Sequence, residues 1–169
     1  MRKRLISIGV AVLMVIPLTA IAAQPDVIVD DTFAFGPEVQ PILSGYCGFD
    51  VVTEGSESVR VMDFYGQDGE LTKTIVHVNG SARYWTDHGV ATENFALAVK
   101  IFPDGSQVTI GNVWNVHDGA GGLLIQDSGR VAFDAIGDIA EVNGPHEELF
   151  AFFEVDDSGV QDFCAALAP

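Results

Sequence analysis

The 169-residue sequence predicts an all-β fold, an antiparallel up-and-down barrel or sandwich of about eight strands followed by a short C-terminal helix. Two observations predict this class. Short segments rich in β-branched and aromatic residues follow one another from residue 47 onward, and turn-forming residues separate them with no helical pattern in between. Strands that follow one another directly pair as antiparallel neighbours, because a parallel pair needs a long crossover connection.

The first 22 residues predict a cleaved secretory signal peptide. A cationic start at residues 2–4 precedes an uncharged apolar run over residues 5–16, and Ala20 and Ala22 offer the small side chains that a signal peptidase reads. A retained anchor is the less favoured alternative, since the run is shorter than the roughly 20 apolar residues of a transmembrane helix. We therefore expect cleavage after Ala22, a secreted protein, and no membrane association of the mature chain.

The composition is strongly acidic. The chain has 8 basic and 24 acidic residues, a net charge of −16, and loss of the three basic residues at positions 2–4 would leave a net charge of −19. Such a chain repels phosphate backbones and anionic headgroups, so binding to nucleic acid or to a membrane surface is not expected. Solubility outside the cell is the simpler explanation of the acidity. Attraction to cations or to basic partners is the more specific alternative.

Residues 23–45 predict an extended lead that contains three prolines and an acidic pair. Its periodicity is weak, and Phe33 and Phe35 are the side chains expected to pack part of it against the rest of the protein. A single β domain is then expected over residues 46–169. The chain that remains after signal cleavage is long enough to bury a core of its own.

Seven segments of the expected domain carry the strand pattern. They are GFDVVTE, SVRVMDFY, LTKTIVHV, SARYWT, ENFALAVKIF, SQVTIGNVWNVH and the expected hairpin GLLIQDSGRVAFDAI. The expected turns lie at Gly55-Ser56, Asp68-Gly69, Asn79-Gly80, Asp87-His88-Gly89, Pro103-Asp104-Gly105 and Asp127-Ser128-Gly129. Asn112 interrupts the apolar row of its segment, which indicates either a buried polar side chain or a bulge.

The last segment, SGVQDFCAALA, predicts the C-terminal helix, with Ser158 as its N-cap. Val160, Phe163, Cys164 and Leu167 share one face of this helix. That face is expected to lie on the β domain.

Cys47 and Cys164 are the two cysteines of the chain. In an oxidising compartment two cysteines usually pair, so a disulfide between the start and the end of the domain is expected. A reactive thiol is less favoured, because no histidine lies within 25 residues of Cys47. A metal site is less favoured still, because the close ligand spacing of zinc motifs is missing.

The sequence offers two weak candidates for a polar site, His77 and His117, and each has a simpler explanation as an ordinary strand or turn residue. No catalytic residue is nominated. Neither a metal nor a cofactor is expected, because the spacings typical of zinc, calcium, nucleophile-elbow and phosphate-loop motifs do not occur. The Asp-Gly pairs at 68–69, 104–105 and 118–119 are interpreted as turns.

The arrangement of these segments resembles a family of small secreted β-rich bacterial proteins, common in actinobacteria, whose activity is uncharacterised. The likeness depends on the first cysteine in CGFDV, the VTIGN strand, the GLLIQDSGRVAFD segment and the last cysteine in FCAALA, and it spans roughly residues 45–169. It implies the β fold and the disulfide, and it implies no catalytic residues. The acidic lead and the HEELFAFFEVDD segment depart from it.

These observations favour a monomeric binding or cell-envelope-associated module, with a small apolar ligand in its interior if the sheet closes into a barrel. The alternative is a secreted hydrolase or cyclase-like barrel enzyme that uses His77, His117 and a nearby carboxylate. Two histidines and an acid within hydrogen-bond reach of one another in a pocket would favour the enzyme.

Overall fold

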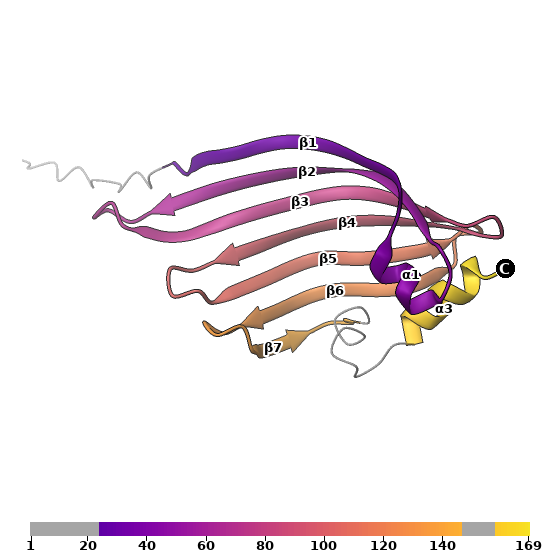
Figure 1. The fold of residues 1–169 in the computed structure, drawn as a ribbon. Coiled ribbons are helices and arrows are strands. Elements are labelled where there is room, and N and C mark those ends of the chain that lie inside the picture. Colours follow the sequence, from indigo (N-terminus) through magenta and orange to yellow (C-terminus); the bar gives the residue numbers. More distant parts are fainter. Residues whose placement is uncertain (1–23, 147–157) are drawn as a thin grey trace, which may run out of the picture.

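The computed structural model describes residues 24–146 and 158–169 (Figure 1). Its main element is a seven-stranded antiparallel sheet in which each strand pairs with the next one in the chain. The strands are β1 (Asp26–Val39), β2 (Val52–Tyr65), β3 (Leu71–Trp85), β4 (Val90–Ile101), β5 (Gln107–Asp118), β6 (Leu123–Phe133) and β7 (Ile139–Asn143). Two helices, α1 (Pro41–Cys47) and α3 (Ser158–Leu167), lie together at one end of the sheet. The predicted all-β class, the succession of antiparallel strands and the C-terminal helix are confirmed.

The sheet is open. Within the described residues, β1 and β7 are its two edges, and they do not pair with each other (Figure 1). An open barrel or a sandwich layer therefore describes the architecture, and the sheet encloses no barrel interior.

Three of the expected turns lie inside long strands, so seven strands take the place of about eight shorter ones. Gly55-Ser56 belongs to β2, Asn79-Gly80 to β3, and Asp127-Ser128-Gly129 to β6. The pairing continues through all three sites, although β5 has a bulge opposite the third. The turn-forming residues therefore need another explanation at these positions.

Close packing explains two of the glycines. A Cβ atom on Gly80 would collide with the ring of Phe95, and a Cβ atom on Gly55 would collide with the ring of Phe35 and the carbonyl oxygen of Ser81. Glycine inside a strand often marks such a close approach of another group. Here it lets two aromatic rings lie directly over the backbone of the neighbouring strands.

The other expected turns form. Asp68, Asp104 and Asp118 each accept a hydrogen bond on Oδ1 from the backbone N–H two residues further on, at 3.1, 2.9 and 2.8 Å. This is the geometry by which aspartate stabilises a tight turn, and it confirms the turn interpretation of the three Asp-Gly pairs. A register shift between Asn112 and Trp114 shows that Asn112 lies at a bulge.

The expected lead is part of the sheet, because β1 pairs with β2 along most of its length. The chain then forms α1, which begins after Gln40, where the Gln40 side chain accepts a 2.9 Å hydrogen bond from the N–H of Ile42. α1 ends at Gly48, which adopts a left-handed conformation with φ of 76°. The folded domain therefore begins before the boundary expected at residue 46.

The core lies where the two helices cover the sheet. Val160, Phe163 and Leu167 of α3 are buried, as the predicted helical face requires. The Phe163 ring packs edge-on against Tyr84 and at a tilt against Trp114, with centroid distances of 5.4 and 6.1 Å. Aromatic pairs of this kind contribute about 0.5–1.5 kcal/mol beyond the area that they bury. One ring therefore anchors α3 to both β3 and β5.

Successive side chains of a strand point to opposite faces of the sheet. We call the face that the helices cover at one end the apolar face. We call the opposite face, which carries the lysine and arginine side chains together with Met62, Ile75 and Ile110, the polar face. Two rows of aliphatic side chains cross β2, β3 and β4 on the apolar face. They are Val59, Val78 and Leu97 in one row, and Val61, Val76 and Val99 in the next. Both rows lie away from the helices, where no described element packs over the sheet (Figure 1).

Cys47 and Cys164 form a disulfide that joins α1 to α3, so the predicted pairing is confirmed. The two cysteines are 117 residues apart, and the loop between them contains six of the seven strands. A second tie holds the end of α3, where the hydroxyl of Thr86 donates a 2.7 Å hydrogen bond to the carbonyl oxygen of Leu167.

The predicted signal peptide, residues 1–22, lies outside the described residues. Neither α1 nor α3 has the length and apolar character that a membrane-crossing helix needs. The disulfide is compatible with an extracellular protein.

Replacement of both cysteines by alanine is expected to lower the free energy of unfolding by about 4.7 kcal/mol, the chain-entropy value for a closed loop of roughly 100 residues. Urea unfolding of the oxidised protein and of the double variant measures the difference, and the reduced wild-type protein is the control that should behave like the variant. Equal unfolding midpoints for the oxidised protein and the variant would contradict a stabilising role for the bond.

Candidate functional site

The strongest candidate site is a buried acid, Glu93 of β4, which is only 6% exposed on the apolar face. The hydroxyl of Tyr84 on β3 donates a hydrogen bond to Glu93 Oε2, and the indole N–H of Trp114 on β5 donates a second one to the carboxyl. The strand register brings the three together. Glu93 lies directly opposite Ala82 and Val116, so Tyr84 and Trp114 are its diagonal neighbours, two residues away on the same face.

Burial raises the pKa of Glu93 from its ordinary value of 4.5 to about 7. The hydrogen bonds from Tyr84 and Trp114 lower the pKa, because they stabilise the charged carboxylate, but they do not offset the lost hydration. Near neutral pH both the protonated and the ionised form are therefore populated. A carboxyl group with such a perturbed pKa beside a cavity is a typical mark of a functional site.

A cavity of about 270 Å³ lies beside this acid, between the start of α1 and the middle strands. It is lined by Gln40, Ile42, Leu43, Tyr84, Glu93, Val113 and Trp114, and we call it the Glu93 cavity. The bulge in β5 contributes Val113 to its wall. Most of the lining is aliphatic or aromatic, so the site combines an apolar wall with one carboxyl group that can be neutral or charged.

A second buried polar pair lies on the far side of Trp114. Asp127 of β6 is directly opposite Trp114, and its Oδ1 lies 2.8 Å from Nδ1 of His146. His146 Nε2 lies 3.1 Å from the carbonyl oxygen of Asn143 and donates to it, because a carbonyl can only accept. Neither Asp127 nor His146 lines the Glu93 cavity. The pair therefore fixes the end of β7 and does not extend the candidate site.

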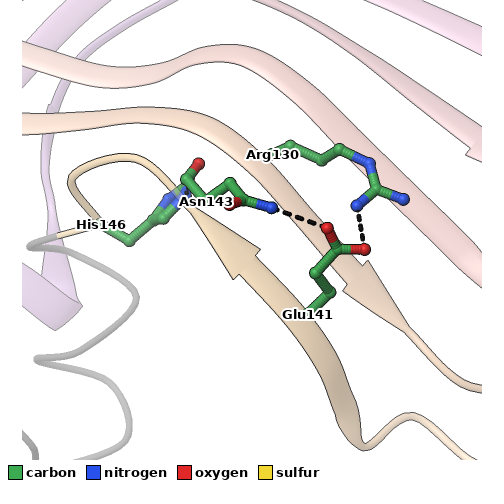
Figure 2. A network of polar contacts seen from close by, with 4 residues as sticks. All are labelled: Arg130, Glu141, Asn143 and His146. Carbon is green, nitrogen blue, oxygen red and sulfur yellow. Dashed lines mark hydrogen bonds and ion pairs between the residues drawn. The ribbon is translucent and has the colours of Figure 1, made fainter.

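The contacts of β7 continue on the polar face, as Figure 2 shows. The side-chain amide of Asn143 donates a 2.7 Å hydrogen bond to Glu141, and Glu141 forms an ion pair with Arg130 of β6. The hydrogen bond and charge of Arg130 hold the pKa of Glu141 below its ordinary value. These groups are exposed, and they tie the short last strand to its neighbour.

A shallow hollow of about 560 Å³ lies over β1 to β4. Its side chains include Ser56, Ser81 and Asn94, which alternate to the polar face, and at its rim Arg83 lies 3.6 Å from Glu54. The serine, asparagine and arginine side chains are exposed to water. An open, hydrated surface of this kind is a weaker candidate for small-molecule binding than the Glu93 cavity.

The structure does not bring the two candidate histidines together. His77 and His117 both project from the polar face, but His77 lies level with Ala98 and Ile110, whereas His117 is much further along β5. The separation along the strand is about 23 Å at 3.3 Å per residue. Among the described residues, no group of three or more His, Cys, Asp or Glu side chains could hold a metal ion. These positions give no support to a catalytic site built from two histidines.

Sequence reasoning missed Glu93. In the ENFALAVKIF segment the apolar row begins at Phe95, and Glu93 lies in phase with it, two residues earlier. An acid in phase with a buried row is the signal that could have found it. Without the register, the same acid is equally well explained as the polar start of a strand.

In comparisons with known proteins, no family model, curated protein or solved structure matches the chain. The resemblance to small secreted actinobacterial proteins therefore stays a prediction.

The raised pKa of Glu93 predicts a pH-dependent stability. Between the ordinary pKa of 4.5 and the folded value of about 7, only the folded protein holds this proton, so the free energy of unfolding falls as pH rises through this window. The loss is about 3 kcal/mol for this one group. Glu93→Gln removes the titration, so the stability of this variant relative to wild type should increase by that amount from pH 4.5 to pH 8.

Urea unfolding at several pH values measures this relative stability. Glu54→Gln on the polar face is the matched control for the loss of one acidic side chain. A difference in free energy of unfolding between Glu93→Gln and wild type that stays constant with pH would show that folding does not raise the pKa of Glu93.

Proposed function

We propose that the protein is an extracellular binding module that holds a small, largely apolar molecule in the Glu93 cavity. The observation that carries this proposal is a carboxyl group with a pKa of about 7 in an otherwise largely apolar cavity. Ligand pockets typically combine an apolar lining with a few polar groups that orient the ligand. The secreted location and the monomeric state belong to the same proposal.

The size and chemistry of the cavity define the class of ligand. A volume of about 270 Å³ is just below the usual range of ligand pockets, which suits a molecule with one aromatic ring or a short alkyl chain. When Glu93 is protonated, its O–H is a donor, for which the Tyr84 hydroxyl and an acceptor oxygen in the cavity can compete. A ligand with a carbonyl or hydroxyl oxygen would supply that acceptor.

The enzyme alternative has less support. A hydrolase site would need a nucleophile or an activated water beside a base, held within hydrogen-bond reach. The Glu93 cavity presents one carboxyl group with an aromatic hydroxyl and an indole, and His77 and His117 do not line it. Binding is therefore the function that this geometry favours.

The binding proposal predicts that acetophenone, a small ring with one carbonyl acceptor, binds in the Glu93 cavity more tightly at pH 6 than at pH 8. Ionisation of Glu93 removes the donor and places a negative charge beside the carbonyl oxygen. The affinity is expected to fall several-fold, because an unpaired buried polar group costs about 1–3 kcal/mol. Glu93→Gln, which keeps a neutral donor at every pH, should bind without this pH dependence.

NMR titration of the indole N–H resonances measures this binding. The signal of Trp114, in the cavity wall, should shift, whereas Trp85 lies outside the cavity and serves as an internal reference. Val113→Phe fills the cavity and should abolish the shift, whereas Ile110→Phe, at an exposed position on the same strand, should not. A shift of Trp114 that survives Val113→Phe would place the ligand elsewhere and refute the proposal.

A further inference from the structure

The apolar face of the sheet continues beyond the helices and the Glu93 cavity. The rows Val59–Val78–Leu97 and Val61–Val76–Val99 lie side by side there, and none of these six side chains is fully buried. Across the three strands β2, β3 and β4 and about 20 Å of strand length, this area is roughly 300 Å², from a strand spacing of about 4.8 Å. The largest apolar patch on a monomer typically begins at about this size and is often an interaction site.

Charge is distributed unequally between the two faces of the sheet. The register places Asp31, Glu57 and Asp63 on the apolar face, close to the two aliphatic rows. Among the described residues, all the lysine and arginine side chains alternate to the polar face; they are Arg60, Lys73, Arg83, Lys100 and Arg130. Among the described residues, Asp31, Glu57 and Asp63 therefore have no lysine or arginine on their own face of the sheet.

The helix α3 already packs against this face of the sheet. At its other end, α3 places Val160, Phe163 and Leu167 against the sheet, so the surface beyond the Glu93 cavity continues an established helix-on-sheet contact. The uncovered length of β4 from Phe95 to Ile101 spans about 20 Å, which matches a helix of roughly 13 residues at 1.5 Å per residue.

We infer that the uncovered apolar face is a docking surface for a basic amphipathic helix of a partner protein. The apolar side of such a helix would cover the two aliphatic rows, and its lysine or arginine side chains would pair with Asp31, Glu57 and Asp63. Opposite charges at the rim of an interface set partner choice and speed association. A helix that lays its apolar side into an apolar surface is a common mode of recognition.

A second copy of the chain fits this surface less well. Face-to-face stacking would bring two copies of the same acids together, and each chain carries a net charge of −16. Like charges placed against each other in an interface oppose association. An anionic lipid surface is disfavoured for the same reason.

The test uses the full-length oxidised protein and a fluorescent 14-residue helical peptide with leucine on one side and lysine on the other. The control peptide has glutamate at every lysine position. Fluorescence anisotropy should show at least ten-fold tighter binding of the lysine peptide, and the affinity should fall as salt rises from 0.05 to 0.5 M. Equal affinities for the two peptides, or no binding of either, would overturn the inference.

Variants locate the bound peptide. Glu57→Gln combined with Asp63→Asn should weaken binding of the lysine peptide about five-fold, since each exposed ion pair contributes modestly. The matched control on the polar face is Asp30→Asn combined with Glu54→Gln, which should change the affinity less than two-fold. These exposed or half-exposed positions leave the core intact, and a thermal melt checks that both variants fold. Equal losses in the two double variants would mean that only net charge matters and would refute a specific surface.

Two further measurements distinguish a bound partner helix from other occupants of the apolar face and from ligand binding in the Glu93 cavity. Val113→Phe should leave peptide binding unchanged even though it fills the Glu93 cavity, so the ligand proposal and the docking proposal can fail independently. Peptide binding should perturb the methyl NMR signals of Val61, Val78 and Val99. If these signals do not respond, or if sedimentation equilibrium shows a dimer that the lysine peptide does not dissociate, another segment or a second copy covers the face and the inference is wrong.

Discussion

The contact between the paired helices and one end of the sheet is the constraint on which the rest of the structure depends. α1 and α3 have 7 and 10 residues, too few to be stable helices alone in water. The disulfide makes them one unit, and Phe163 inserts its ring against Tyr84 and Trp114. The same burial removes water from Glu93 and raises its pKa. The stability of the fold and the chemistry of the candidate site therefore share one cause.

The two proposals describe neighbouring parts of one apolar surface. The Glu93 cavity lies beside the start of α1, where the surface is hollowed and a single carboxyl group can orient a small molecule. The two aliphatic rows lie further along the strands, where the surface is broad and its rim is acidic. Because the helices cover only one end of the sheet, one face offers a hollowed site and a broad open site side by side.

Much of the architecture could be predicted from residues that act locally. The strand segments, the Asp-Gly turns, the helical face of Val160 and Phe163, and the cysteine pairing depend on short-range patterns or on compartment chemistry, and all are present. The strand count could not be predicted in the same way. Asn79-Gly80 has the composition of a hairpin, and only the ring of Phe95 over Gly80 shows that the strand continues there. A contact between neighbouring strands overrides the local preference.

The candidate site depends on tertiary contacts even more. Glu93, Tyr84 and Trp114 come from three strands, and their meeting requires both the register and the bulge in β5. No spacing along the chain encodes that meeting. His77 and His117 are candidates for a polar site because of their residue type, but the same register keeps them apart. Burial of one acid, which the sequence alone does not reveal, distinguishes the site.

The open sheet also ends in an exposed edge at β1. An unpaired edge strand can add the edge of another sheet and begin aggregation, and natural proteins often place charged residues and proline there. Four of the 14 residues of β1 are acidic, Asp26, Asp30, Asp31 and Glu38, and Pro37 has no N–H to donate. Two such edges repel each other, so the acidity of this strand limits growth of the sheet beyond seven strands. That protection weakens when carboxylates are protonated in acid or screened by salt, and acidic surroundings would then favour self-association through this edge.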